Sequence, residues 1–575
     1  MILQALLEYY QRKTEEGVIA PDGFTARNID FLIVLDRAGN FNSLDSLREL
    51  KGKRLLGQPF FVPAIGKQAE KHDNSSKDAN LLWDKAEFVL GVGKNGATKL
   101  ESFIATIVEY FPSPPPEVET VLNFLRRGKS DPGVFAPIVN HREYGDDVRG
   151  GIPIIAFKIA GESLPIFCKP FVQMALDQKQ DQAVVYGPCL ITGKRDMPIE
   201  MTHHVVKRIA GAQTSGANLI SFNRESYLSH GWKQSRNAPV SKKAAAGYVK
   251  ALNHLIESDL NRIRIGDATT VFWSQAKSLH ESYDLERNFS WFFADPPKED
   301  PDRGVRAVKS LYEAVQSGIL PTDEGNRFYV LGLAPNAARI AVRFWRAGTI
   351  TEFAVKIKRH FDDLEIDRAP GDAEYLPLNQ ILRATALERK MENVPPNLAG
   401  AVVESILDGT PYPITLMQQC IRRIRAERRV TRARAAILKA YLNRFNLHRS
   451  NAHTGKEEIT VCLDRTNACP GYRLGRLFAI LEKIQEEANP GINATIRDRF
   501  YGAASSSPVA VFPQLLKLKN HHLAKLDNLG RKVNLEKEIG EIFCELKDFP
   551  PHLSMEEQAR FAIGYYHQRQ SFFSK

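Results

Sequence analysis

Hydrophobic and polar positions follow different patterns in the two parts of the chain, and the change falls near residue 370. Before that point, short β-branched and aromatic runs are interleaved with helical patterns, without the regular alternation typical of a parallel α/β sheet. The runs predict strands at residues 31–35, 60–62, 152–157 and 183–186, and helices at 97–110 and 117–127. The sequence therefore predicts a large, irregular α+β domain over residues 1–370.

Long amphipathic helices dominate residues 371–575, with short polar connections between most of them. The predicted helices cover residues 378–391, 401–407, 416–445, 472–488, 514–529 and 535–546. This pattern predicts an all-α helical bundle after the α+β domain. Small polar residues at 449–456 indicate a hinge or linker within the bundle.

Composition and charge point to a soluble globular protein with an anionic partner. The 575 residues are 43% hydrophobic and 25% charged, and the formal net charge is +11. A cationic excess favours polyanions, although a mildly basic solvated surface would give the same number. The six cysteines are scattered and form no C-x-x-C pair, which favours reduced thiols. No apolar run approaches the ~20 residues of a membrane span, and residues 1–10 lack a basic n-region. We expect a cytoplasmic protein that does not enter a membrane.

Familiar catalytic signatures fail when they are compared with the sequence. Residues 211–216 have the glycine spacing of a P-loop, but Ala217 and Asn218 follow where Lys and Ser/Thr are needed. Cys189 with His203 or His204 offers only part of the four ligands of a structural zinc site. No paired-acid nuclease constellation is visible, although distant acids could converge. We therefore expect no enzyme, no metal and no cofactor.

Two polar loops in the first domain are candidates for contact with nucleic acid. Residues 211–223 place amides and hydroxyls around two glycines, groups that hydrogen-bond phosphates, sugars and base edges. A second loop, residues 231–241, ends at Ser241, which is positioned to cap a helix beginning at Lys242. The alternative is a pair of turns with internal hydrogen bonds. The candidate DNA-binding residues here are Gln213, Thr214, Ser215, Asn218 and Asn237.

A third polar loop, residues 66–77, follows an apolar strand-like run. Its lysines suit phosphate groups, and its short polar side chains suit base edges. A mobile solvent loop is the alternative interpretation. The candidates are Lys67, Lys71, Asn74, Ser75, Ser76 and Lys77.

Basic residues crowd one predicted helix of the bundle, with Glu427 the only acid among them. Charged faces are usually only solvated, but like charges on neighbouring turns repel unless an anion lies nearby. Besides Arg423, Arg434, Lys439 and Arg444, the crowd contains the residues that we expect to contact a nucleic-acid backbone: Arg422, Arg425, Arg428, Arg429 and Arg432.

Several long motifs resemble the large subunit of the type I-C CRISPR Cascade complex, and they run nearly from end to end of the chain. They are residues 1–6, 211–223, 237–240, 328–339, 343–345, 472–482, 493–499 and 564–568. The resemblance implies a subunit without its own nuclease that recognises the protospacer-adjacent motif (PAM) of double-stranded target DNA and promotes R-loop formation. Guide pairing then reads the sequence.

The resemblance also implies the partners of the chain. These are the guide crRNA, the target duplex, the backbone, handle-binding and small subunits of Cascade, and a helicase-nuclease recruited after R-loop formation. Residues from about 455 to 575 are expected to resemble the small subunit, which the family makes from an internal start. The motif-reading residues do not carry over from the family, so the loop assignments rest on side-chain chemistry. A general nucleic-acid-binding or RNA-processing scaffold without motif recognition remains the alternative.

Overall fold

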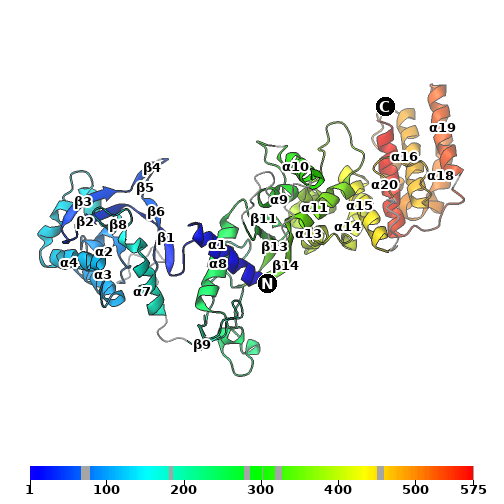
Figure 1. Ribbon diagram of the computed structural model, residues 1–575. Helices are drawn as coiled ribbons and strands as arrows, with labels where there is room; N and C mark the ends of the chain where they lie inside the picture. The colour runs from blue at the N-terminus through cyan, green and yellow to red at the C-terminus, as the bar shows by residue number, and fades with distance from the viewer. Residues whose placement is uncertain are drawn as a thin grey trace. The chain divides into compact units, whose positions relative to one another are not determined.

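The structure is a computed structural model that describes residues 1–52, 54–65, 78–180, 185–276, 285–300, 302–317, 327–449, 459–544 and 546–573. The chain forms two compact units. The first consists of Met1–His204 and Ile220–Ala251, and the second of Val205–Leu219 and Leu252–Lys575. The elements of both units are labelled in Figure 1.

The first unit mixes strands and helices, as the sequence predicts. Its helices are α1 (Ile2–Glu15), α2 (Ala86–Val89), α3 (Gly96–Tyr110), α4 (Pro116–Ser130), α5 (Ala136–Val139), α6 (Gly145–Arg149), α7 (Pro170–Gln180) and α8 (Lys242–Glu257), the last of which continues into the second unit. Its strands are β1 (Phe24–Ile29), β2 (Phe31–Leu35), β3 (Phe41–Ser46), β4 (Glu49–Lys51), β5 (Arg54–Leu56), β6 (Gln58–Pro63), β7 (Trp83–Lys85), β8 (Ile154–Ile159), β9 (Tyr186–Gly187) and β10 (Met197–Pro198).

A four-stranded sheet in the order β3-β2-β8-β7 forms the centre of the first unit. Strands β2 and β8 are parallel, and the two outer pairs are antiparallel. All five residues of β2 are buried, as expected for a continuous apolar run. Helices α3 and α4 lie together beside the sheet (Figure 1). Their Phe103 and Phe124 rings pack against the Phe157 ring, with distances of 6.3 and 6.4 Å between ring centroids.

The second unit begins with an antiparallel sheet in the order β11-β12-β13-β14. Its strands are β11 (Arg262–Ile265), β12 (Ala268–Ser274), β13 (Arg327–Asn336) and β14 (Arg339–Thr349), and helices α9 (Leu285–Phe293), α10 (Arg303–Ser317) and α11 (Ile350–Leu364) accompany them. Phe272 packs against Phe289 of α9 at 4.6 Å, and Phe328 packs against Phe353 of α11 at 5.8 Å. Thr349 and Glu352 form a capping box that fixes the start of α11.

After β14, the described residues of the second unit contain helices and no strands, which confirms the predicted change from an α+β region to a helical one. They are α12 (Leu378–Thr385), α13 (Leu398–Asp408), α14 (Ile414–Glu427), α15 (Arg432–Arg449), α16 (Pro470–Ala488), α17 (Ile496–Ser506), α18 (Pro508–Ala524), α19 (Leu529–Phe543) and α20 (Met555–Ser571). In Figure 1, α16, α18, α19 and α20 run side by side. The predicted hinge after Arg449 lies outside the described residues.

Four predicted helices are wrong in their bounds, and one of them is the helix predicted at 535–546, which begins at Leu529 and ends at Phe543. The helix predicted at 378–391 ends at Thr385, because Glu388 and Arg389 have φ angles of 55° that no right-handed helix accommodates. The one predicted at 416–445 is two helices, separated where Arg428 takes a φ of 53°. The one predicted at 514–529 already begins at Pro508 and ends at Ala524, and Asn528 caps a new helix by accepting a hydrogen bond from the Arg531 N–H at 2.9 Å.

Three glycines allow α16 and α20 to pack with their backbones almost in contact. A Cβ atom on Gly475 would lie 2.0 Å from the Phe561 carbonyl oxygen, and one on Gly564 would lie 2.1 Å from that of Tyr472. A Cβ on Gly471 would lie 2.3 Å from the Glu557 carbonyl oxygen. No side chain fits at these positions, so this glycine seam fixes the distance between the two helices.

Candidate nucleic-acid interface

The described residues on either side of loop 66–77 are held firmly. The Trp83 Nε1–H donates to the Pro63 carbonyl oxygen at 2.9 Å, which ties β7 to the end of β6. Burial raises the pKa of Asp84 to about 6, although the backbone N–H groups of Asn80 and Lys85 donate to its carboxyl group at 2.8 Å. The candidates Lys67, Lys71, Asn74, Ser75, Ser76 and Lys77 themselves lie outside the described residues.

Loop Val205–Leu219 is an excursion of the chain that joins the second unit. Val206 and Ala217 pair through two backbone hydrogen bonds of 2.9 Å, and the Asn218 N–H donates to the Ala338 carbonyl oxygen at 3.1 Å, beside the start of β14. Asn253 of α8 accepts a hydrogen bond from the Lys207 N–H at 2.8 Å. The loop is therefore anchored at its base. At its tip the candidates Gln213, Thr214 and Ser215 are exposed, and Asn218 is half-buried near the base.

The glycines of this loop serve its own backbone. Gly216 has a φ of 102°, and a Cβ atom there would lie 2.8 Å from the Val205 side chain. Gly211 has a φ of 83°, with Pro335 3.1 Å from the position of a Cβ. Both conformations favour glycine without any ligand. The turn supports the exposed polar residues, and the glycines give no separate sign of a bound phosphate.

Asn237 holds the second polar loop together. Its Oδ1 accepts from the Ser229 N–H at 2.8 Å, and its Nδ2 donates to the carbonyl oxygens of Trp232 and Gln234 at 3.1 and 2.8 Å. Helix α8 begins at Lys242 as predicted, and the Ser241 hydroxyl accepts from the Ala244 N–H at 3.4 Å. Both amide hydrogens of Asn237 are donated inside the loop, so this side chain holds the loop together; these three hydrogen bonds are called the Asn237 clamp below.

The basic residues of this predicted helix form an exposed group and a buried group, and the buried Arg423 lies among the exposed residues in sequence. Arg422, Arg425, Arg428 and Arg429 are exposed at the end of α14 and in the turn after it. Arg432 begins α15 and donates to the carbonyl oxygens of Ala373 and Glu374, the latter at 3.0 Å. The exposed four offer guanidinium groups to solvent, whereas Arg432 already binds the protein.

The remaining cations of this segment are buried with internal partners. Arg434 is fully buried and pairs with Glu427 at 2.6 Å. Arg444, also fully buried, pairs through Nε with Asp363 and donates to the carbonyl oxygens of Ser405 and Thr410 at 3.2 and 3.1 Å. Much of the repulsion that the sequence suggests is therefore relieved inside the protein.

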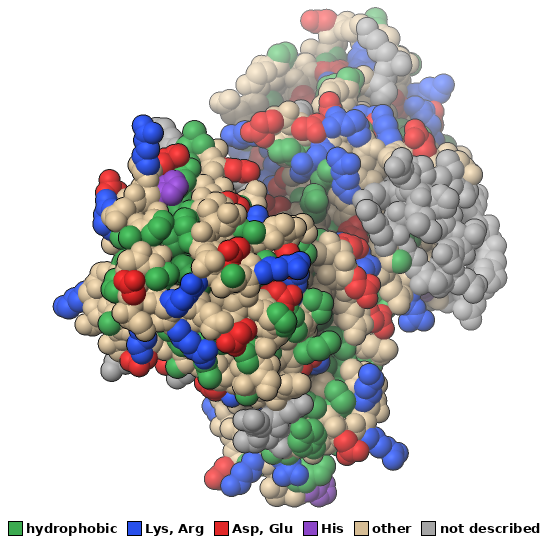
Figure 2. Space-filling model, turned by 60° about the vertical axis from the view of Figure 1, so that its left-hand side comes forward, with side chains coloured by type: hydrophobic (Ala, Val, Ile, Leu, Met, Phe, Trp, Pro, Cys, Tyr) green, Lys and Arg blue, Asp and Glu red, His purple; other side chains and the backbone are tan. Residues whose placement is uncertain are grey.

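Lys and Arg side chains are dispersed among Asp and Glu on the face drawn in Figure 2. That face carries no continuous basic patch among its described residues. The net charge of +11 therefore does not locate a binding surface on that face, and local groups such as the exposed arginines of α14 carry more information.

Cys189 and His203, two of the three residues considered for a zinc site, have other partners. The Cys189 Sγ lies 3.3 Å from the backbone nitrogen of Ser241, and His203 Nδ1 lies 2.6 Å from the Tyr248 hydroxyl. Burial lowers the pKa of His203 to about 4, which keeps the imidazole neutral at physiological pH. Among the described residues, no group of three or more His, Cys, Asp or Glu side chains is arranged to hold a metal. All six cysteines are free.

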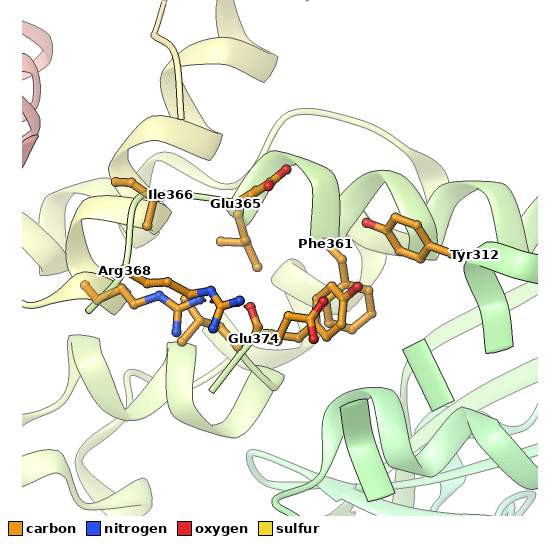
Figure 3. Close-up of a pocket in the computed structure, with 10 residues that line it drawn as sticks. Tyr312, Phe361, Glu365, Ile366, Arg368 and Glu374 are labelled. Atoms are coloured by element: carbon orange, nitrogen blue, oxygen red, sulfur yellow. Dashed lines mark hydrogen bonds between the residues drawn. The ribbon is translucent and has the colours of Figure 1, made fainter. Parts of the chain in front are cut away.

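A small charged pocket in the second unit was not expected from the sequence. It has a volume of about 180 Å³, and Arg368 and Tyr312 lie on opposite sides of it in Figure 3. Two of its charged groups already have partners in the protein, since Glu374 binds Lys309 at 3.0 Å and Arg432 donates to the Glu374 carbonyl oxygen. Its volume is too small for a large ligand.

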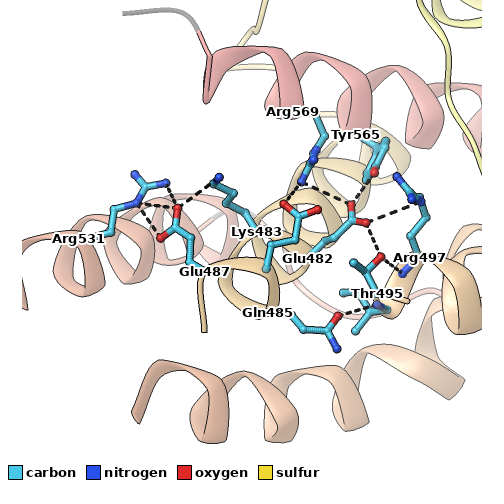
Figure 4. A network of polar contacts seen from close by, with 11 residues as sticks. Glu482, Lys483, Gln485, Glu487, Thr495, Arg497, Arg531, Tyr565 and Arg569 are labelled. Carbon is cyan, nitrogen blue, oxygen red and sulfur yellow. Dashed lines mark hydrogen bonds and ion pairs between the residues drawn. The ribbon is translucent and has the colours of Figure 1, made fainter. Parts of the chain in front are cut away.

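A buried polar network in the C-terminal helices was also missed. Glu482 is fully buried, and it accepts hydrogen bonds from Tyr565 and, at 2.6 Å, from Thr495. Arg497 and Arg569 each lie 3.8 Å from its carboxylate (Figure 4). In the sequence, the only sign of this network is the charged Glu482 in the middle of an apolar helix pattern, because its partners come from α17 and α20.

Comparisons with known proteins identify the family of the chain. In the described part of the chain, no helix has the length and apolar character needed to span a bilayer. No curated protein matches the chain. A family model described as CRISPR-associated protein (Cas_Csd1) matches residues 6–573. Nearly the whole sequence is covered, including both units, and the chain therefore belongs to the Cas_Csd1 family, the large subunits of the type I-C CRISPR Cascade complex.

Proposed function

We propose that this protein binds double-stranded target DNA within an RNA-guided type I-C Cascade complex, recognises the PAM and promotes R-loop formation. It then supports recruitment of a separate helicase-nuclease and performs no catalysis itself. Its partners are the guide crRNA, the target duplex, and the backbone, handle-binding and small subunits, and it acts in the cytoplasm. The family match is the observation that carries the proposal. It is supported by the exposed polar tip at Gln213–Ser215 and by the exposed arginines of α14.

The assembled complex provides the deciding experiment. Its affinity is measured for two duplexes that match the guide equally and differ only in the presence of the motif. We expect tighter binding to the duplex with the motif, because protein contacts at the motif precede guide pairing. Equal affinities would instead favour the alternative of a general nucleic-acid-binding or RNA-processing scaffold.

Loop 66–77 and residues 213–218 are proposed as the surfaces that read the motif. Lys71→Ala should weaken all duplexes to a similar degree, because phosphate contacts carry no sequence information. Asn74→Ala and Gln213→Ala should each reduce the advantage of the correct motif by about 1–3 kcal/mol, the usual value of a good base contact. The measurement is again the affinity of the complex for targets that differ only in the motif.

Lys94→Ala is a matched control for Lys71→Ala, since Lys94 is an exposed lysine outside these loops. Assembly with guide RNA should survive all of these changes. If Asn74→Ala and Gln213→Ala both keep the full motif preference, the residues that recognise the motif lie on other loops.

The exposed arginines of α14 are proposed to bind the backbone of the nucleic acid. Replacing Arg422, Arg425, Arg428 and Arg429 together by glutamine should weaken matched and unmatched DNA alike. The slope of log affinity against log salt should fall by roughly 0.9 for each phosphate group that the variant no longer neutralises. Arg432→Gln should mainly lower stability, because Arg432 donates to backbone carbonyl groups. An unchanged slope in the fourfold variant would show that these side chains only face water.

The last part of the chain, from about residue 455, is proposed to form a small-subunit-like module. Within residues 459–573, α16 packs on α17, α18, α19 and α20, and Phe478 contacts Tyr501, Phe512 and Phe561 at 5.8–6.4 Å. A fragment starting at residue 455 should be soluble and helical by circular dichroism and should co-purify with the complex. A fragment starting at residue 430, which adds α15, should unfold at higher denaturant concentration, because α15 packs on α20. Failure of the shorter fragment to fold and to co-purify would refute the module.

A further inference from the structure

Residues 224–236, here called the indole loop, expose aromatic side chains next to cations. Trp232 is 46% exposed and Tyr227 is 39% exposed. Arg224, Lys233 and Arg236 are exposed as well, and Glu225 is the only acid in the segment. Trp is highly buried on average, so an exposed Trp that shares a short basic loop with an exposed Tyr marks this loop as a candidate interaction surface.

The loop has a defined shape despite its exposure. The Asn237 clamp described above joins Ser229, Trp232 and Gln234, and it fixes the backbone on both sides of the indole. The backbone N–H of Trp232 donates to the Ser229 carbonyl oxygen at 2.9 Å, and Ser235 is only 2% exposed. The end of the loop is secured where the Leu190 N–H donates to the Pro239 carbonyl oxygen at 2.9 Å.

A side chain presented in this way is prepared for binding, because the backbone beneath it does not need to be ordered when a ligand arrives. Aromatic rings with neighbouring cations are the combination found where proteins bind unpaired nucleotides. The ring stacks on a base, and the cations neutralise the adjacent phosphates. In a duplex, by contrast, the faces of the bases are already covered by neighbouring base pairs.

We propose that the indole loop binds unpaired nucleotides, with bases stacked on Trp232 and Tyr227 and phosphates held by Arg224, Lys233 and Arg236. The inference rests on the proposed function in one respect, namely that the chain works on nucleic acid. It adds a surface for single strands, separate from the residues proposed to read the duplex motif. Because every base has a π-face, this surface has little sequence preference.

Intrinsic fluorescence of the full chain tests the proposal directly. Trp232 is the most exposed tryptophan, since Trp83 and Trp273 are buried and Trp291 and Trp345 are half-buried. An oligothymidylate single strand should quench the emission, and a thymidylate–adenylate duplex of equal length should quench it much less. Trp232→Phe should remove the quenching but keep most of the affinity for the single strand. Trp232→Ala should weaken single-strand binding about tenfold and leave duplex binding nearly unchanged.

Phe573→Ala is the matched control, because Phe573 is an exposed aromatic residue, 68% accessible, far along the chain. It should leave single-strand affinity unchanged, and all variants should have the circular dichroism spectrum of the parent. Single-strand affinity that survives Trp232→Ala would overturn the proposal, as would equal losses for single strand and duplex. Loss of co-purifying subunits with intact single-strand affinity would overturn it in favour of a protein-docking surface.

The result is independent of motif recognition. A Trp232→Ala complex should keep its preference for the correct motif. If the parent complex shows no motif preference, the proposed function fails, but the oligothymidylate measurement still decides the role of the indole loop.

Discussion

Arg444→Met should lower the free energy of unfolding of the second unit by about 3–5 kcal/mol. The methionine retains an unbranched side chain but leaves the Asp363 carboxylate buried without its partner, and an unpaired buried charge is strongly destabilising. Chemical denaturation followed by circular dichroism measures the effect. Arg465→Met is the matched control, since Arg465 pairs with Glu541 on the surface and should contribute less than about 1 kcal/mol.

The pH dependence of Arg444→Met supplies an independent check. Burial already raises the pKa of Asp363, and Arg444 acts in the opposite direction. Removing Arg444 should raise that pKa further above its value in the unfolded chain. A raised carboxyl pKa stabilises the fold at low pH, and this contribution is lost as the pH rises through the folded pKa. The deficit of the variant should therefore be smaller at acidic pH than at neutral pH. Adding Asp363→Leu should recover much of the loss at neutral pH, and an equal deficit at every pH would show that the unpaired carboxylate is not the cause.

Gly475→Ala should also destabilise the protein, by about 1–3 kcal/mol or more, although alanine is the better helix former. The added Cβ would lie 2.0 Å from the Phe561 carbonyl oxygen, so α16 and α20 would have to separate. Gly540→Ala in α19 is the matched control, because nothing lies within 4 Å of its Cβ position. That substitution should instead stabilise by up to about 1 kcal/mol through helix propensity. Equal changes in the denaturation midpoint for the two variants would mean that the seam tolerates a methyl group.

The sequence predicts elements well where a local pattern determines them. Strand β2 coincides with the apolar run 31–35, and α3 and α4 follow their amphipathic patterns to within a few residues. Helix α20 is not among the predicted helices, because it buries polar residues such as His567 and Gln568, whose partners Tyr472 and Arg476 lie far away in the sequence. A periodicity of apolar residues cannot reveal a helix whose buried face is partly polar.

The candidate site shows the same limit. Exposed Arg425 and buried Arg444 look alike in the sequence, because the carboxylate that pairs with Arg444 lies 81 residues away. Asn237 is a candidate for its hydrogen-bonding capacity, and the structure uses that capacity within its own loop. Trp232 lies in the candidate loop 231–241 but is not among the candidate residues, because one tryptophan in a polar segment carries no periodic signal. The distinction between a side chain that binds a ligand and one that binds the protein depends on tertiary contacts.

The division of the chain into units has a consequence for inheritance. The first unit resumes at Ile220 after the excursion Val205–Leu219, which belongs to the second unit. Recombination that transfers the whole first unit from one gene to another must therefore also transfer the excursion. Its exposed Gln213–Ser215 tip would travel with the donor, while β14 and the Ala338 carbonyl oxygen that anchors Asn218 would come from the recipient. Exchange should succeed only between relatives whose β14 begins with its backbone in the position where the excursion can pair with it, which constrains how the family can diversify by shuffling segments.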